Sequence, residues 1–67
     1  MNFEIVEVKN RKYAQFQDSK ENRAFLKKVV LIAGGSIYKN GEGIVYQGIG
    51  AYGNLQEWYK KLFGKFQ

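Results

Sequence analysis

The chain has 67 residues, of which eleven are Lys or Arg, six are Asp or Glu, and none is Cys or His. These counts exclude disulfides, thiolate nucleophiles, zinc sites built from Cys and His, and acid–base catalysis by His. A chain this short holds one domain, residues 1–67, with a small core that a homodimer would support. We therefore expect a basic binding module that is not an enzyme and has no catalytic residues, cofactor or metal.

The N-terminal segment predicts a β-hairpin. Residues 3–8 are rich in β-branched and aromatic side chains, and residues 11–17 alternate between two faces. Lys9 and Asn10 lie between these strands, and Asn tolerates the positive φ of a tight turn. The alternation of the second strand sets Lys12, Ala14 and Phe16 against Tyr13, Gln15 and Gln17.

A helix is expected from about Ser19 towards Gly34. Asp18 stands three residues before Glu21, which is the spacing of a capping box with Asp as the N-cap. At about 100° per residue, one broad side of this helix is apolar and a cationic stripe lies opposite. The apolar side consists of Phe25, Leu26, Val29, Val30, Ile32 and Ala33, and the stripe consists of Lys20, Arg23 and Lys27.

Leu31 does not fit this helix, because it projects onto the cationic side. Either Leu31 is exposed, or the helix ends near Lys28 and residues 29–33 form a buried strand. Periodicity does not decide between the two for so short an apolar run. Gly34 and Gly35 are expected to end the helix. The alternative, a double-glycine leader of a secreted peptide, agrees less well with the basic residues that precede them.

No targeting or membrane-spanning segment is expected. The longest apolar run, residues 29–33, is far below the roughly 20 residues that span a bilayer. The N-terminus lacks the basic and then apolar regions of a signal peptide. We therefore expect a cytoplasmic protein.

The second half of the chain predicts another hairpin and another helix. Residues 40–43, Asn-Gly-Glu-Gly, lie between two β-rich runs, residues 36–39 and 44–47, and the Asn40-Gly41 pair supplies the positive φ values of a hairpin turn. Asn54 is a good N-cap for the last helix. The apolar stripe of this helix consists of Leu55, Trp58, Tyr59, Leu62, Phe63 and Phe66.

The predicted order of elements is therefore β-β-α-β-β-α. This is a small α+β fold in which two hairpins form a single antiparallel sheet, and two amphipathic helices cover one face of that sheet. The order differs from that of single-strand binders in which strands are followed by one C-terminal helix, so no residue roles are transferred from them.

A glycine motif precedes the last helix. Gly48, Gly50 and Gly53 match G-x-G-x-x-G after a predicted strand. A dinucleotide-binding fold needs a further parallel strand and an acidic residue about 20 positions on, and the chain is too short for both. Two interpretations are left. The glycines form a phosphate nest at the helix N-terminus, or they allow a bend and a close approach of strand and helix.

The positive charge is concentrated in the predicted helices. Residues 20–33 carry a net charge of +3 and residues 54–67 carry +2, whereas the predicted strands and turns are neutral. Lys20, Arg23 and Lys27 have no acidic residue four positions away, so we expect a positive stripe that favours phosphates. The alternative is a solvated face that keeps a small protein soluble.

Tyrosines accompany cations in the predicted strands. Four tyrosines lie in or beside the predicted strands, near Arg11, Lys12 and Lys39: Tyr13, Tyr38, Tyr46 and Tyr52. Tyr13 shares its strand face with Arg11, Gln15 and Gln17. A sheet face with aromatic and cationic side chains is typical of single-strand binders, which stack bases and hold phosphates. The alternative is that these tyrosines pack across strands.

The leading hypothesis is therefore a nucleic-acid-binding module, in which helix cations neutralise phosphates and strand tyrosines contact bases. The candidate residues are Arg11, Lys12, Tyr13, Lys20, Arg23, Lys27, Tyr38 and Lys39. The main alternative is a small phage or plasmid inhibitor or adaptor, anti-CRISPR-like or for host takeover, that binds a host protein, because abundant Tyr suits interfaces. A minor alternative is a cationic membrane-active peptide that uses the last helix. No small-molecule substrate is expected.

Overall fold

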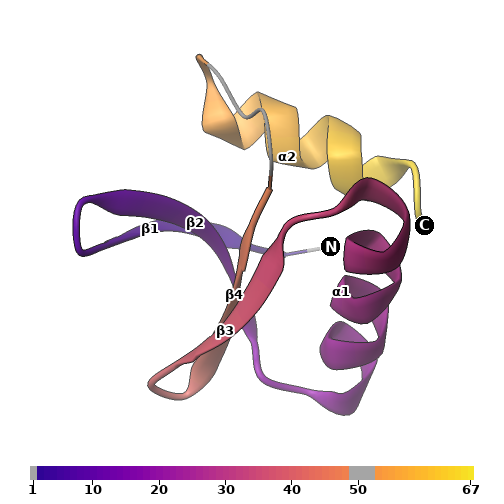
Figure 1. The fold of residues 1–67 in the computed structure, drawn as a ribbon, viewed down its shortest axis with the longest axis horizontal. Helices are drawn as coiled ribbons and strands as arrows, with labels where there is room; N and C mark the ends of the chain where they lie inside the picture. Colours follow the sequence, from indigo (N-terminus) through magenta and orange to yellow (C-terminus); the bar gives the residue numbers. More distant parts are fainter. Residues whose placement is uncertain (1, 49–52) are drawn as a thin grey trace.

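The chain folds into one four-stranded sheet and two helices, shown in Figure 1 as a computed structural model that describes residues 2–48 and 53–67. The elements are β1 (Glu4–Val8), β2 (Arg11–Gln17), α1 (Lys20–Ala33), β3 (Ser36–Asn40), β4 (Gly43–Gln47) and α2 (Leu55–Gly64). All strand pairs are antiparallel, and the strand order in the sheet is β1-β2-β4-β3. The predicted α+β fold and the order β-β-α-β-β-α are confirmed.

Two tight turns close the hairpins. Lys9 and Asn10 have φ values of 52° and 67°, so both central residues of the first turn are left-handed, as in a type I′ turn. In the second hairpin Asn40 pairs with Gly43, and the turn consists of Gly41, with φ 58°, and Glu42. The observed turn lies within the predicted segment, residues 40–43, but Asn40 ends β3, and Gly41, not Asn40, has the positive φ.

Helix α1 starts one residue later than its predicted cap implies. The side-chain oxygen of Ser19 accepts a hydrogen bond from the backbone N–H of Asn22 at 3.1 Å, so Ser19 and not Asp18 is the N-cap. The helix continues to Ala33, and Gly34 follows as the C-cap with φ 81°. The segment left open by the sequence, residues 29–33, is therefore helical.

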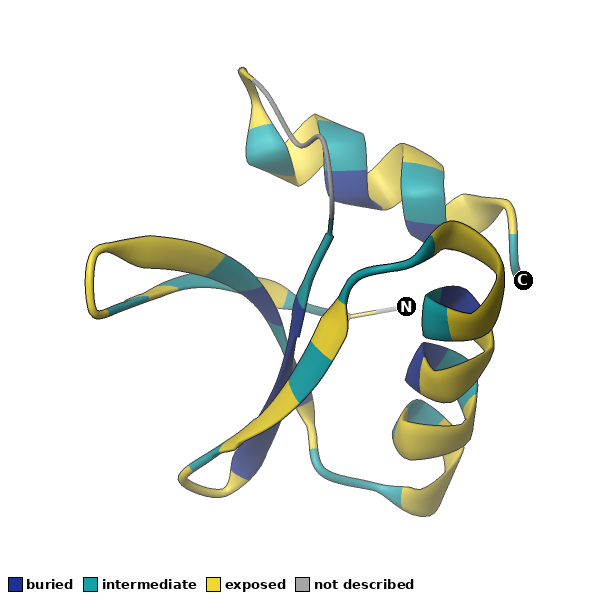
Figure 2. Ribbon diagram, in the orientation of Figure 1, coloured by how far each residue is buried: buried dark blue, intermediate teal, exposed yellow. Residues whose placement is uncertain are grey.

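The core lies between the helices and one face of the sheet, which we call the inner face (Figure 2). Phe63 of α2 lies at its centre, with ring centroids 5.1 Å from Phe16 and 5.8 Å from Phe25. The buried residues of this core are Ala14, Phe16, Leu26, Val29, Ile44, Tyr46, Tyr59 and Phe63. The predicted apolar stripe of α2 is therefore confirmed as a packing surface.

The buried stripe of α1 is narrower than predicted. Ile32 and Ala33 are exposed, although the sequence places them on the apolar side. Ile32 lies on the same side of the helix as Phe25, which packs against the core, so Ile32 is exposed because it lies in the last turn of the helix and not because of its angle around the helix axis. Ala33 is the last residue of the helix, beyond the buried part. Leu31 is exposed and the helix continues past it, which is the first of the two alternatives predicted for this residue.

No helix among the described residues is long and apolar enough to cross a membrane.

Candidate binding surface

One face of the sheet has no helix packed on it in the described part of the chain. Both helices contribute their buried residues to the core on the inner face. On the opposite side, the strand register places Val6 beside Tyr13, and places Val45 between Gln15 and Tyr38. We call this surface the outer face. It consists of Val6, Tyr13, Gln15, Tyr38 and Val45.

An aromatic pair dominates the outer face. The rings of Tyr13 and Tyr38 meet edge to face, with centroids 6.0 Å apart and planes inclined by 76°. Tyr38 is 49% exposed, whereas Val45, which lies in the strand between them, is only 2% exposed. Neighbouring side chains and not a helix therefore bury Val45. Val45 thus forms the apolar base of a platform, and the rings of Tyr13 and Tyr38 form its accessible surface.

Amide side chains extend this platform towards one end of the sheet. The side-chain amide nitrogen of Asn40 donates a hydrogen bond to Oε1 of Gln15 at 2.9 Å. Each amide keeps further donor or acceptor capacity for a ligand. Both residues also line an open groove of about 770 Å³. The other lining residues are Asn2, Phe3, Glu4, Phe16, Gln17, Glu42, Gly43, Gln56 and Lys60.

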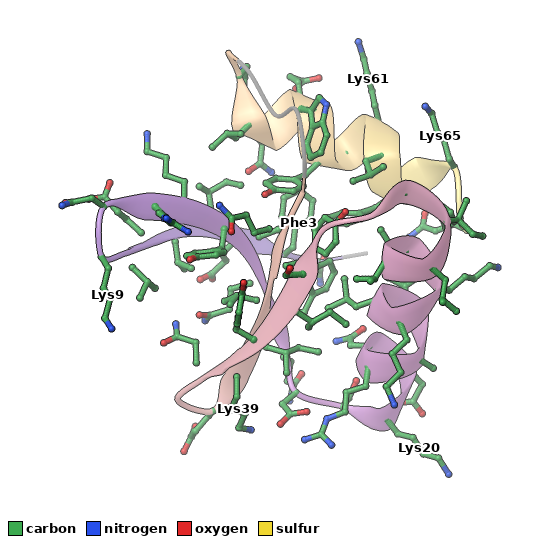
Figure 3. The ribbon with its side chains drawn as sticks, viewed as in Figure 1. Phe3, Lys9, Lys20, Lys39, Lys61 and Lys65 are labelled. Carbon is green, nitrogen blue, oxygen red and sulfur yellow. The ribbon has the colours of Figure 1, made fainter. Side chains whose placement is uncertain are left out.

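Cations lie at the tip of the first hairpin, next to the aromatic pair. Lys9, Arg11 and Lys12 are all exposed, and Figure 3 shows Lys9 at the protruding end of the β1–β2 hairpin. Arg11 is two residues from Tyr13, so it belongs to the same side of β2. Lys12 points to the other side, where it pairs in register with Glu7. Arg11 is therefore the cation closest in position to the outer face.

An ion-pair cluster holds two of the predicted phosphate-binding cations. Arg23 contacts the Asp18 carboxylate through Nε at 2.5 Å and Nη2 at 2.8 Å, and Lys39 donates to the same carboxylate. The hydrogen bonds from Arg23 first, and then from Lys39, hold the pKa of Asp18 well below its usual range. Arg23 is therefore paired with a carboxylate, although no acidic residue stands four positions from it, and the predicted positive stripe is weakened at this residue. Its partner stands five positions earlier, before the helix begins.

The remaining cations of the predicted stripe lie far from the tyrosines in the fold. Lys20 and Lys27 border a shallow hollow beside Asp18 and Arg23 on the exposed side of α1. Because α1 packs on the inner face, this side of the helix points away from the sheet. Lys20 and Lys9 accordingly lie at opposite ends of the molecule in Figure 3. The structure thus brings Tyr13 and Tyr38 into contact and places Arg11 two residues from Tyr13 on the same side of β2, whereas Lys20, Lys27, Arg23 and Lys39 lie elsewhere.

The glycine motif is described only in part, because Gly50 lies outside the described residues. Gly48 allows a close approach, since a Cβ atom there would lie 2.5 Å from Cη2 of Trp58. Gly53 has φ 69° and directly precedes the N-cap Asn54. Packing against Trp58 explains Gly48 without a ligand. The phosphate nest itself stays a prediction.

Sequence reasoning overlooked part of this surface. The alternation of β2 places Gln15 on the side of Tyr13, but Val45 and Asn40 lie on other strands. Only the pairing of β2 with β4 brings them next to Gln15. That pairing joins residues about thirty positions apart, and no local pattern in the chain specifies it.

Among the described residues, no group of three or more acidic side chains is arranged to hold a metal ion. Comparison with protein-family models, with curated proteins and with solved structures gives no match. The geometry of the outer face is therefore the basis for the functional argument.

Proposed function

We propose that this protein binds single-stranded nucleic acid through the outer face of its sheet. The observation that carries the proposal is the Tyr13–Tyr38 pair, which is accessible on a face that no helix of the described residues covers, with Arg11 two residues before Tyr13 on β2. Unpaired bases offer flat surfaces that stack on aromatic rings, and a sheet holds such rings in fixed positions. Base pairs in a duplex hide these surfaces, so the proposal is specific to single strands.

The charge distribution supports phosphate contacts beside this platform. Lys9 and Arg11 project from the hairpin that continues the outer face, and the whole chain carries a net charge of +5. The platform itself is nearly neutral, so stacking and phosphate binding involve different side chains. The groove lined by Gln15 and Asn40 also includes Phe16 of the inner face and Gln56 and Lys60 of α2, so it leads from the outer face towards the side that carries the helices. A single strand bound on the outer face does not need the cations of α1.

The test is fluorescence anisotropy with labelled oligothymidine and oligouridine at low salt. Because stacking on one aromatic side chain is worth about 1–3 kcal/mol per base, Tyr38→Ala should weaken binding roughly 10-fold or more. Leu31→Ser is a matched control, since Leu31 is also exposed, its replacement leaves the charge unchanged, and it lies away from the outer face. Absence of binding by the unaltered protein, or equal effects of both substitutions, would contradict the proposal.

A second candidate, a protein-binding inhibitor or adaptor, has one observation in its favour. On the side of the sheet that carries the aromatic pair, Glu4 and Arg11 balance each other in charge, and Tyr and Arg are enriched at protein interfaces. Affinity capture from a host lysate, with and without nuclease, separates the two functions. A single protein retained after nuclease treatment supports the inhibitor, whereas loss of all retained material supports nucleic-acid binding.

A further inference from the structure

Two large apolar side chains are exposed at the C-terminal end of α1. Leu31 is 86% exposed and Ile32 is 68% exposed, the highest values for large hydrophobic residues among those described. They do not belong to the outer face, and the core does not use them. Isolated exposed apolar residues are ordinary, but adjacent ones on a helix end form a convex apolar surface.

Two lysines lie beside these apolar side chains on α1. Lys27 and Lys28 are exposed one turn before Leu31 and Ile32 on the same helix. We call this region the basic apolar end. It consists of Lys27, Lys28, Leu31 and Ile32.

Acidic residues of the helices lie at their other ends. Glu21 is in the first turn of α1 and Glu57 is in the first turn of α2. The two acidic residues therefore do not compensate the lysines of the basic apolar end. This arrangement selects an occupant that carries negative charge and also accepts apolar side chains.

A second copy of the chain and a nucleic acid each meet only part of this requirement. Two copies joined at Leu31 would bring Lys27 and Lys28 of both chains together, and like charges repel. A nucleic acid would contact the lysines through phosphates, but its backbone offers no apolar environment for Leu31 and Ile32. An anionic bilayer satisfies both features, because apolar tips enter the headgroup and acyl boundary while lysines remain among the lipid phosphates.

We propose that the basic apolar end docks the protein onto membranes rich in anionic phospholipid. The contact is peripheral: Leu31 and Ile32 insert, and Lys27 and Lys28 contact headgroups. A convex surface suits a bilayer, since lipids adapt to its shape and no preformed pocket is required. The proposal is independent of the proposed function, because it uses none of the residues of the outer face.

The test is sedimentation with vesicles of phosphatidylcholine alone or with about one-third phosphatidylserine. We expect binding to the anionic vesicles only. The double substitution Leu31→Ser, Ile32→Ser should lower the fraction of protein bound to the vesicles at least about 10-fold. The reason is that serine side chains do not gain the free energy that Leu and Ile gain when they move from water into the apolar part of the bilayer. Both residues are exposed, so the variant should fold, which circular dichroism checks. Its affinity for oligothymidine should equal that of the unaltered protein.

Three results would overturn the proposal. The first is no binding to anionic vesicles, which points to an acidic protein as the occupant. The second is equal binding of the unaltered protein and the Leu31→Ser, Ile32→Ser variant, which means that the lysines act alone. The third is a dimer in light scattering that this variant abolishes, which assigns the surface to a second copy. Substitution of Lys27 and Lys28 by Glu should abolish vesicle binding while leaving Leu31 exposed.

Discussion

The buried hydroxyl of Tyr46 donates a hydrogen bond to the carbonyl oxygen of Gly34 at 2.7 Å. This bond joins the central strand β4 to the C-cap of α1, so it fixes where the helix ends relative to the sheet. It also satisfies a carbonyl group at the helix C-terminus that has no partner within the helix. The relationship leads to a direct prediction for stability.

Replacement of Tyr46 by Phe should destabilise the fold by about 1–2 kcal/mol, because the substitution removes the donor and leaves the Gly34 carbonyl partly buried without it. In urea unfolding this appears as a lower midpoint with an unchanged slope. Tyr38→Phe is the matched control. Because the Tyr38 side chain is half exposed, this substitution should change the free energy of unfolding by less than about 0.5 kcal/mol. Equal midpoints for both variants would argue against a structural role of the Tyr46 hydroxyl.

A second prediction concerns Gly35, which has φ 95°. A Cβ atom there would lie 2.5 Å from the backbone oxygen of Gln47 and 2.7 Å from the hydroxyl of Tyr46. Gly35→Ala should therefore cost more than the roughly 1 kcal/mol of backbone strain alone, because β4 or the Tyr46 hydroxyl has to move. Gly64→Ala should instead stabilise by up to about 1 kcal/mol, since Gly64 ends α2 and its Cβ would meet open space. In thermal unfolding, the midpoint temperature should be lower for Gly35→Ala and higher for Gly64→Ala than for the unaltered protein.

Acid should weaken the link between β3 and the start of α1. The pKa of Asp18 lies below its ordinary value because Arg23 and Lys39 donate hydrogen bonds to the carboxylate. A carboxyl group whose pKa is lower in the folded state stabilises that state above its unfolded pKa, about 3.9, and loses this contribution as the pH falls further. Urea unfolding at about pH 6 and about pH 3 should show reduced stability at the lower pH.

Asp18→Asn should make this pH dependence shallower, because the amide does not titrate. The matched control is Glu42→Gln in the β3–β4 turn, whose side chain is exposed and has no ion pair among the described residues. If the Asp18→Asn and Glu42→Gln variants lose stability equally between the two pH values, the cluster at Asp18 is not the acid-sensitive element.

Alkaline conditions should also destabilise the core. Burial raises the pKa of both Tyr46 and Tyr59 above 10.0. The unfolded chain then loses these phenolic protons before the folded chain does, so stability is intact below about pH 10 and falls as the pH rises further. Urea unfolding between about pH 8 and about pH 11 measures this decline. Tyr46→Phe should reduce the decline, and a variant with an unchanged decline would contradict the assignment of Tyr46.

The elements of the fold could be predicted from local patterns, whereas their contacts could not. Alternation in β2 correctly assigns Ala14 and Phe16 to the core and Tyr13 to the other face, because side chains of a strand point to alternate sides. Asp18 shows the limit of such reasoning. Its spacing from Glu21 fits a helix cap, but Ser19 takes that position. Asp18 then binds Arg23 and also Lys39, which is 21 residues away.

The candidate surface shows the same limit. Tyr13 could be selected from its strand alone, but its contact with Tyr38 depends on the insertion of β4 between β2 and β3. The position of the α1 cations, away from this contact, follows from which face of the sheet the helix covers. Neither the strand order nor the covered face is specified by a local pattern, since both result from packing among distant residues.

The separation of the tyrosines from the α1 cations gives a final prediction about salt. Each phosphate contact to a single strand contributes about −0.7 to the slope of log affinity against log salt concentration. Arg11→Ser should therefore reduce the magnitude of this slope by about 0.7, because Arg11 lies next to Tyr13 on β2. Lys27→Ser removes the same charge from the exposed side of α1 and should leave the slope unchanged. Equal changes for the two variants would mean that the strand also contacts α1, and the outer face would then not be the whole binding site.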